Sequence, residues 1–382
     1  MEVDAVSPQP LTEEVLERCL TDSDLVALRW RQRLHSIESL PDGTEVVYPP
    51  TYADIGYSID TLQDGRKVAL IDSIGSQANR LERLFMPGGE LASLVPQYTI
   101  KINNGSRVSI HELAHRAADA TVMSTPELAD LSQRAFREYA DGDATTMCAN
   151  FPTALLFGAW DSRGDTGVKL PRLVRAEIRA WDVEPLHAAA QFNSVWKRLD
   201  ADQRNQLEAE AKKQKKELSE YGLKDSPAVF RSRRVKKYLD DGRLNQEARV
   251  LGGILVKGEI LRHVAVNLIA LRGHTTREVE STSQLQRYLL GLALLTVTAP
   301  VEMYLRQGAL LHEGTQTPWE LLSRDGSVAE LDLSTSRDML RTYTERAAAP
   351  FREHQEPRDE YEFDTNAAKR LLAKKVEEEG EE

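Results

Sequence analysis

The clearest alternation of apolar and polar residues in the chain runs from Val174 to Val183. One face of this segment would carry Val174, Ala176, Ile178 and Ala180, and the other Arg175, Glu177, Arg179 and Trp181. A period of two predicts a β-strand with one buried face. A helix is the competing interpretation, because Arg172, Arg175 and Arg179 would also share a helical face. We predict the strand.

The same reading of the remaining chain predicts a mixture of helices and strands. Thr125, Pro126 and Glu127 form a helix start, with proline at the first helical position. Residues 199–221 predict a highly charged helix with little apolar surface to bury, ending near Gly222. The other predicted helices are 11–20, 25–37, 125–139 and 283–296, and the other predicted strands are 45–48, 68–71, 155–160 and 260–271.

The run from Ala69 to Leu84 combines a short apolar strand, a turn and a helix. Its helical part holds a cluster of side-chain donors, namely Gln77, Asn79, Arg80 and Arg83. The start of a helix offers free backbone N–H groups, which suit a phosphate. An ordinary strand–turn–helix with a solvated face is the alternative, because the run lacks the glycine spacing of a phosphate-binding loop.

Composition predicts a cytoplasmic protein that is not bound to a membrane. The chain has 382 residues, of which 41% are hydrophobic, enough for one large domain or two ordinary ones. It begins with an acidic stretch that lacks the apolar core of a signal peptide, and its longest apolar run, 289–300, is too short to span a bilayer. Cys19 and Cys148 are too few for a disulfide framework.

The net charge of −11 is concentrated at the two ends. Residues 1–24 sum to −6 and residues 351–382 to −5, so residues 25–350 are neutral overall. Within them, residues 197–237 carry +6, and the densest basic patch is 230–239, where arginines and lysines alternate with Phe230 and Tyr238. Such a pattern suits nucleic acid, and an exposed charged helix is the alternative. We therefore divide the chain into an N-terminal helical segment 1–44, a body 45–350 with a charged helical insertion at about 197–225, and an acidic tail 351–382.

Two motifs bear on catalysis. His111, Glu112 and His115 fit the H-E-x-x-H pattern of zinc peptidases, but no third ligand is marked beyond a distant Glu138. The competing role is structural, with Ala117, Ala118 and Ala120 packing closely and Arg116 facing out. Asp161 and Asp165 flank Ser162–Gly164 and fit either catalytic acids or a turn. His263, in an apolar run, is expected to be a core or interface residue.

Several longer segments resemble one family. They are residues 69–84, HRAADA at 115–120, LLFGAWDSRG at 155–164, KLPRLVRAEIRAWDV at 169–183 and VAVNLIALR at 264–272. In this order they resemble the backbone subunit of the type I-G (formerly I-U) CRISPR effector complex, a member of the RAMP superfamily of RNA-binding proteins. The resemblance covers about Tyr48 to Gly308.

The resemblance implies an α+β fold, with a modified RRM or ferredoxin-like palm sheet backed by helices, helical fingers and an extended thumb insertion. It implies a non-catalytic subunit of a Cascade ribonucleoprotein in antiviral defence, without a cofactor. Copies would oligomerise along the CRISPR RNA in an open helical filament and leave its bases free to pair with target DNA. The further partners would be the large subunit, the subunit that processes the RNA and holds its 5′ end, and a recruited helicase-nuclease.

On this interpretation a basic groove holds the RNA backbone. The predicted RNA-binding residues are Ser76, Gln77, Asn79, Arg80, Arg116, Arg163, Lys169, Arg172, Arg175, Arg179, Arg231, Arg233, Arg234, Lys236 and Lys237. Two alternatives stay open: a zinc-dependent hydrolase that uses His111, Glu112 and His115, and a RAMP-type RNA endonuclease that uses a loop aspartate.

Overall fold

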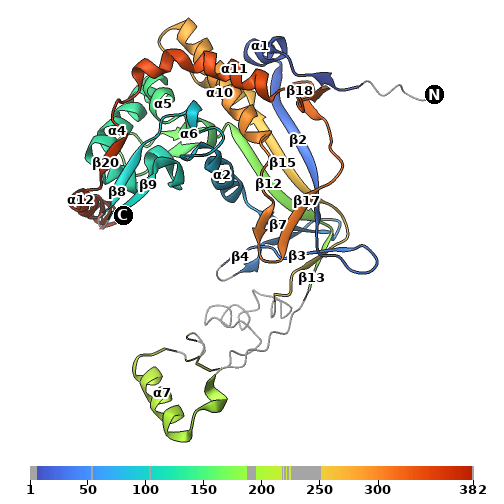
Figure 1. Ribbon diagram of the computed structural model, residues 1–382, viewed down its shortest axis with the longest axis vertical. Coiled ribbons are helices and arrows are strands. Elements are labelled where there is room, and N and C mark those ends of the chain that lie inside the picture. Colours follow the sequence, from blue (N-terminus) through green and yellow to red (C-terminus); the bar gives the residue numbers. More distant parts are fainter. Residues whose placement is uncertain are drawn as a thin grey trace.

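The structure is a computed structural model. It describes residues 7–52, 55–102, 105–186, 195–216, 218, 221, 223–224 and 251–380. The fold is mixed α+β and is built on one large mixed sheet (Figure 1). Some residues of the predicted insertion 197–225 and the whole basic patch 230–239 lie outside the described residues.

The large sheet has ten strands among the described residues. Its main path runs in the order β1-β19-β18-β2-β15-β12-β7-β6, and β17 and β16 extend it from β2. All neighbouring strands are antiparallel except β1 and β19. The strands are β1 (Gln9–Pro10), β2 (Leu25–Ser36), β6 (Ile59–Thr61), β7 (Lys67–Asp72), β12 (Val174–Trp181), β15 (Ile260–Asn267), β16 (Tyr304–Arg306), β17 (Ala309–Glu313), β18 (Trp319–Ser323) and β19 (Val328–Asp332).

Four small sheets surround the large one. Their strands, in pairing order, are β13 (Val183–Pro185), β14 (Ile254–Val256) and β3 (Glu45–Val47); β20 (Glu360–Glu362), β8 (Thr99–Ile102) and β9 (Ser106–Ser109); β4 (Thr51–Tyr52) and β5 (Gly56–Tyr57); and β10 (Ala159–Trp160) and β11 (Lys169–Leu170).

Helices cover one face of the large sheet. On this face α2 contacts β12, α10 contacts β15 and α9 contacts β2. The helices are α1 (Glu13–Thr21), α2 (Ile74–Glu82), α3 (Ala120–Met123), α4 (Pro126–Ala140), α5 (Thr145–Asn150), α6 (Pro152–Phe157), α7 (Ala201–Lys213), α9 (Leu268–Gly273), α10 (Val279–Val297), α11 (Arg337–Ala348) and α12 (Thr365–Gly380). Short 3₁₀ turns lie at Arg83–Phe85, Ala92–Leu94, Ile110–Glu112, Arg116–Ala118, Val195–Arg198 and Ala349–His354.

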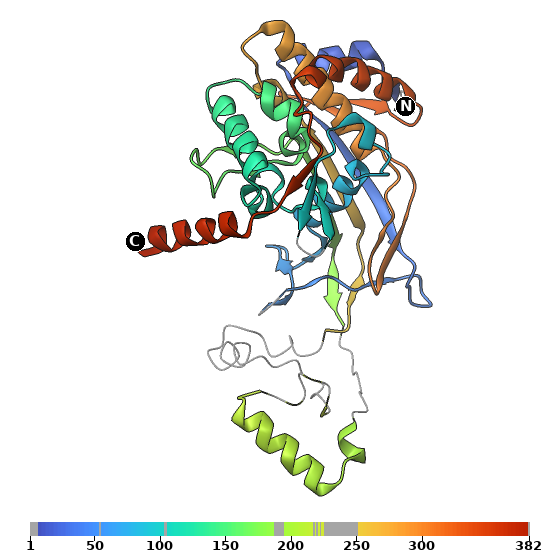
Figure 2. The same cartoon turned by 60° about the vertical axis from the view of Figure 1, so that its left-hand side comes forward.

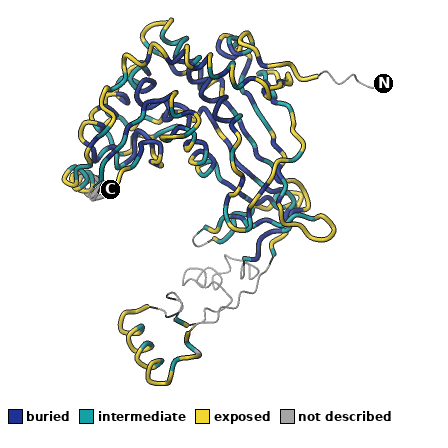
Figure 3. The backbone as a smooth tube through the Cα atoms, in the orientation of Figure 1, coloured by how far each residue is buried: buried dark blue, intermediate teal, exposed yellow. Residues whose placement is uncertain are grey.

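The core lies between this face and the helices. Leu28, Val264 and Ala176 from three adjacent strands pack there against buried leucines of α10, such as Leu289 and Leu292. Figure 3 shows the buried backbone concentrated in these layers. Burial of apolar area at about 25 cal/mol per Å² makes this layer the main source of stability. Helix α7 contains no buried residue, as its highly charged sequence predicts.

Most predicted elements are confirmed. The strand at 174–183 is β12 rather than a helix, the run 69–84 forms β7 and α2, and helices form at 13–21, 126–140 and 279–297. The charged helix predicted at 199–221 is shorter and ends at Lys213.

The helix predicted at 25–37 is wrong, because this segment is β2. Leu28, Gln32 and Leu34 are buried whereas Arg31 and Arg33 are exposed, which is a period of two. Pairing with β15 on one side and β17 and β18 on the other outweighs the helix propensity of its leucines and arginines. Residues 25–36 are therefore part of the large sheet.

Two predicted strands are wrong in part. Residues 152–157 form α6 and only Ala159–Trp160 is a strand. All six residues of α6 are buried, so its sequence carries no periodic signal. The strand predicted at 260–271 ends at Asn267, whose side chain accepts a hydrogen bond from the Ala270 backbone N–H at 2.9 Å and begins α9.

The segment 351–363 is an integral part of the fold. Strand β20 pairs with β8, and Tyr361 is buried against Tyr98. Helix α12 follows and projects from the body (Figure 2).

Candidate nucleic-acid interface

The three central strands of the large sheet present nine side chains on the face opposite the helices. The strand register places them in three rows: Arg175, Ala265 and Arg29; Glu177, His263 and Arg31; and Arg179, Leu261 and Arg33. Five of these nine positions are arginine and one is glutamate. We call this set the arginine face.

The arginines of this face reach solvent. The side chains of Arg31, Arg33 and Arg175 are 49%, 48% and 54% exposed, and those of Arg29 and Arg179 are 35% and 30% exposed. Their exposure follows from the alternation along each strand, because the intervening residues point into the helix-covered core. The face is therefore a cationic surface on a rigid element.

Shared carboxylates hold the arginines in place. Glu177 accepts hydrogen bonds from Arg175 Nη2 at 2.8 Å and from Arg179 Nε at 3.2 Å. Glu320 of β18 does the same for Arg29 Nε and Arg31 Nη2, at 2.5 and 2.6 Å. Since a guanidinium has five N–H groups, each arginine keeps donors for an external anion. The glutamates thus position the guanidinium groups at the cost of part of the positive charge.

A cavity of about 440 Å³ opens between the outer strands of this face. Ala265 and His263 line it on β15, and Arg29, Arg175 and Arg179 line it from the strands on either side. Glu177 and Trp181 of β12 also line it, so three arginines face one glutamate. We call it the Ala265 cavity. Burial lowers the pKa of His263, and nearby Arg31 and Arg29 lower it further against the opposing effect of Glu177. These effects together favour the neutral form of the ring.

The donors predicted at the start of α2 converge on a carboxylate of the chain itself. Asp72, at the end of β7, is buried and accepts hydrogen bonds from Ser76 Oγ at 2.8 Å, Gln77 Nε2 at 2.7 Å and Arg80 Nε at 3.0 Å. Arg306 Nη2 adds a fourth contact at 3.3 Å. Of the four donors predicted here, Gln77 and Arg80 meet at Asp72 instead of at an open phosphate site.

The four donors predicted on α2 differ in their burial and in their further contacts. Gln77 is buried, and its Oε1 accepts a hydrogen bond from the fully buried Arg262 at 2.9 Å. Arg80 also donates to the Leu305 carbonyl at 3.0 Å. Asn79 and Arg83 are exposed.

Arg116 does not face out, contrary to the expectation from sequence. It is buried, has a φ of 55° and donates from Nε and Nη2 to Glu82 at 2.6 and 2.8 Å. Its Nη1 donates to the Gly158 carbonyl at 2.9 Å. Arg172 is exposed but donates from Nε to the Phe157 carbonyl at 3.0 Å. Its pKa is lowered mainly by desolvation and also by neighbouring Arg116.

Two predicted residues lie near the loop after β10. Lys169 is exposed, with its Nζ 4.6 Å from the centre of the exposed Trp160 ring, and Arg163 is half-buried. The loop is held by buried Asp161, which accepts hydrogen bonds from Thr166 and Gln133. This arrangement fits the turn interpretation of Asp161. The predicted residues Arg231, Arg233, Arg234, Lys236 and Lys237 lie outside the described residues.

The H-E-x-x-H residues do not share a helical face. The segment forms two separate 3₁₀ turns. His111 is buried and its Nε2 donates to the Pro96 carbonyl at 2.9 Å, whereas the His115 side chain is 61% exposed. Glu112 caps its own turn by accepting from the Ser109 backbone N–H at 2.7 Å. Among the residues that the structure describes, no group of three His, Cys, Asp or Glu side chains could hold a metal ion.

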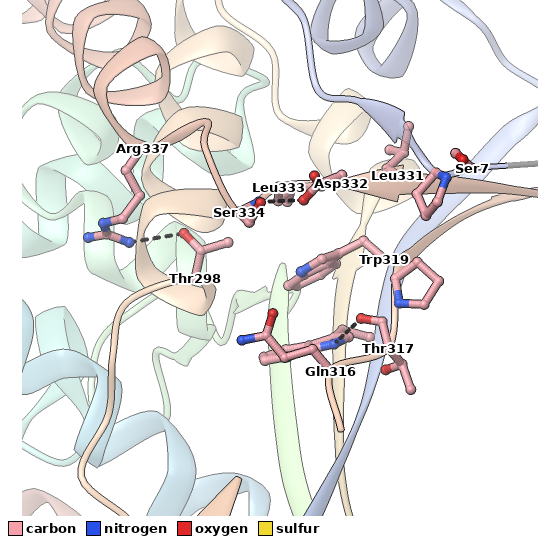
Figure 4. Close-up of a pocket in the computed structure, with 13 residues that line it drawn as sticks. Ser7, Thr298, Gln316, Thr317, Trp319, Leu331, Asp332, Leu333, Ser334 and Arg337 are labelled. Atoms are coloured by element: carbon pink, nitrogen blue, oxygen red, sulfur yellow. Dashed lines mark hydrogen bonds between the residues drawn. The ribbon is translucent and has the colours of Figure 1, made fainter. Parts of the chain in front are cut away.

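A further cavity, of about 560 Å³, lies on the helix-covered side beside β18 and β19 (Figure 4). Its wall includes stacked Trp30 and Trp319, with ring centres 5.4 Å apart. Trp30 Nε1 donates to the Thr317 carbonyl at 3.0 Å, and Arg337 donates to Thr298 at 3.0 Å. The indole and guanidinium donors that reach this wall are therefore already partly satisfied within the chain.

Sequence reasoning missed Arg29, Arg31 and Arg33. They stand at every second residue, between Leu28, Trp30, Gln32 and Leu34, which is the same alternation that identified β12. Because a helix was predicted over this segment, the alternation typical of a strand was overlooked. Arg175 and Arg179, predicted from β12, are the two candidates that the structure brings together with them on the arginine face.

Residues 28–185 match the family model of CRISPR-associated protein GSU0053. This chain is a CRISPR-associated protein. The matched range contains β2, β7, α2 and β12 of this CRISPR-associated protein, and hence both arginine-bearing walls of the Ala265 cavity. None of the curated proteins matches the chain. Over the described residues, the helices are too short or too polar to cross a membrane.

Proposed function

We propose that this CRISPR-associated protein is the non-catalytic, guide-RNA-binding backbone subunit of a type I-G interference complex. The observation that carries the proposal is the arginine face on β2, β15 and β12. On this proposal the large sheet with its helices on one side is the RRM-like palm of a RAMP protein, and the insertion between β13 and β14 is its thumb.

Charge and geometry both support RNA as the ligand. A chain with a net charge of −11 avoids general attraction to nucleic acid, so a local cluster of five arginines selects where a polyanion docks. Guanidinium groups bind phosphate oxygens through paired N–H donors. Phosphate contacts are independent of sequence, which is what a protein needs if it is to hold guides of any sequence.

The proposal assigns no catalytic step to the chain. The two sequence motifs that suggested chemistry have other partners: Asp161 accepts hydrogen bonds that hold its loop, and His111 and Glu112 hold their turn. Copies would assemble head to tail along the guide in an open filament, with the large subunit, the RNA-processing subunit and the helicase-nuclease as partners in the cytoplasm. Target DNA would bind through the guide.

The test compares matched arginine variants. Purified protein is expected to carry repeat-derived RNA, visible in its absorbance at 260 and 280 nm and identified by sequencing. The variant Arg29→Ala/Arg175→Ala should bind a guide-length RNA more weakly, with a slope of log affinity against log salt that is shallower by roughly 0.7 for each lost phosphate contact.

The control is Arg18→Ala/Arg346→Ala, which removes the same charge from exposed positions on α1 and α11. Its RNA affinity and salt slope should stay near those of the unmodified chain. Equal weakening in both variants would attribute binding to net charge alone and contradict the assignment of the face. Site-specific RNA cutting that is lost in Asp161→Ala would instead favour the endonuclease.

A further inference from the structure

The Ala265 cavity is built by a small residue between two large cations. Arg29, Ala265 and Arg175 are direct neighbours across three strands, so the two arginines stand two interstrand spacings apart, roughly 10 Å. The alanine methyl leaves the space between them open. An anion that enters there meets a guanidinium on each side.

The next position along β15 is aromatic. His263 lies two residues from Ala265, on the same face and about 7 Å along the strand. It is half-buried, and its Nε2 has no hydrogen-bond partner among the described residues. A flat aromatic ring beside an anion site matches the alternation of phosphate and base along a nucleic acid strand.

The positive charge of the arginine face decreases along β15 from Ala265, past His263, to Leu261. A second cavity of about 440 Å³ follows over Leu261, and its wall includes Glu259, Glu320 and Glu330 besides Arg31 and Arg33. The Ala265 cavity, lined by three arginines and one glutamate, Glu177, is therefore the more favourable of the two for a phosphate. The second cavity is less favourable for a phosphate because its three glutamates outnumber its two arginines.

We propose that the Ala265 cavity seats one phosphate of a single unpaired RNA strand, which runs along β15 so that the adjacent base stacks on His263. This inference rests on the proposed function, since it takes RNA as the ligand. It names the phosphate site, which we call the seat, the path of the RNA along β15 and the residue on which a base stacks. Arg29 and Arg175 lie on opposite sides of Ala265, and the space between them suits the backbone of one RNA strand.

Chemical protection at position 265 tests the seat. The native cysteines, Cys19 and Cys148, are both buried, so a cysteine introduced by Ala265→Cys is a reporter for maleimide labelling. Saturating single-stranded RNA should slow labelling at 265 at least tenfold. The control Ala329→Cys, on exposed β19, should label at the same rate with and without RNA.

Substitution tests the two positions separately. Ala265→Leu fills the seat without changing charge and should weaken RNA binding more than tenfold, whereas Ala329→Leu should have no effect. His263→Ala should weaken binding roughly 5- to 150-fold, the range for loss of one stacked base, and His263→Phe should restore most of it. Thermal unfolding of each variant verifies that the fold is retained.

The outcomes separate the two proposals. If the Arg29→Ala/Arg175→Ala variant loses RNA but position 265 stays reactive and Ala265→Leu binds normally, the seat is wrong and the proposed function stands. If neither the arginine variant nor RNA saturation changes anything at this face, the proposed function of the face fails as well. Protection at 265 together with equal binding by His263→Ala and the unmodified chain would overturn the stacking part.

Discussion

Glu82 and Arg116 form a buried ion pair that joins α2 to the turn at 116–118. Desolvation raises the pKa of Glu82, and the adjacent guanidinium of Arg116 opposes that rise. Arg116→Met would leave the carboxylate buried without its cation. We expect a loss of about 3–5 kcal/mol in the free energy of unfolding, measured by urea denaturation.

The matched control for this pair is Glu82→Leu/Arg116→Met, which removes both charges. It should recover most of the lost stability, because an apolar pair of similar size leaves no uncompensated charge. A single variant as stable as the unmodified chain would show that the pair is not buried in solution.

Arg80→Ala should act on stability before it acts on RNA. The substitution removes one of the donors to buried Asp72 and a contact to the Leu305 carbonyl, so we expect a loss of about 1–3 kcal/mol. The exposed neighbour Arg83→Ala should change stability by less than about 0.5 kcal/mol. Thermal unfolding distinguishes the two, and RNA affinity is then compared for equal amounts of folded protein.

The insertion should be separable from the fold. It leaves from β13 and returns through β14, and these strands pair directly, with Pro185 opposite Ile254. Replacing residues 187–251 by a short Asn-Gly hairpin turn should therefore keep the unfolding midpoint within a few degrees. If this variant keeps its stability but loses RNA affinity, the basic residues of the insertion contribute to binding. Failure to fold would contradict the expectation.

Acid should destabilise the protein through two buried histidines. Burial lowers the pKa of His111 and of His274 to about 4, against 6.5 in an unfolded chain. Between these values the unfolded chain binds more protons than the folded one, so stability falls as the pH drops from about 7 to 4, by roughly 3 kcal/mol per histidine at most. Urea denaturation at a series of pH values should show a shallower pH dependence in His111→Gln/His274→Gln.

The two parts of the C-terminal segment should differ. Removing residues 365–382 deletes projecting α12 and a net negative charge, so stability should change little and RNA affinity should stay equal or rise slightly. Tyr361→Ala should cost about 3 kcal/mol, because this ring is buried against Tyr98. Loss of assembly in the truncated protein, measured by light scattering with RNA, would make α12 an interface element.

Local patterns predicted the elements whose burial is one-sided. The alternation in β12 and the proline start of α4 needed no knowledge of the rest of the chain. The prediction failed where burial is complete, as in α6, and where helix-forming residues are held in a strand by two neighbours, as in β2. Gln77 and Arg80 on α2 were predicted as donors, but only the structure shows that Asp72, at the end of β7, is their acceptor.

Strand β2 is made early in synthesis, yet its partners β15, β17 and β18 all lie in the last third of the chain. A ribosome-bound nascent chain that has passed residue 185 already carries β7 and β12 but lacks the strand that must stand between β12 and β2. The arginine face cannot exist until β15 has emerged and inserted. If RNA binds this face as we propose, a nascent chain cannot hold RNA there before residues 260–267 have left the ribosome.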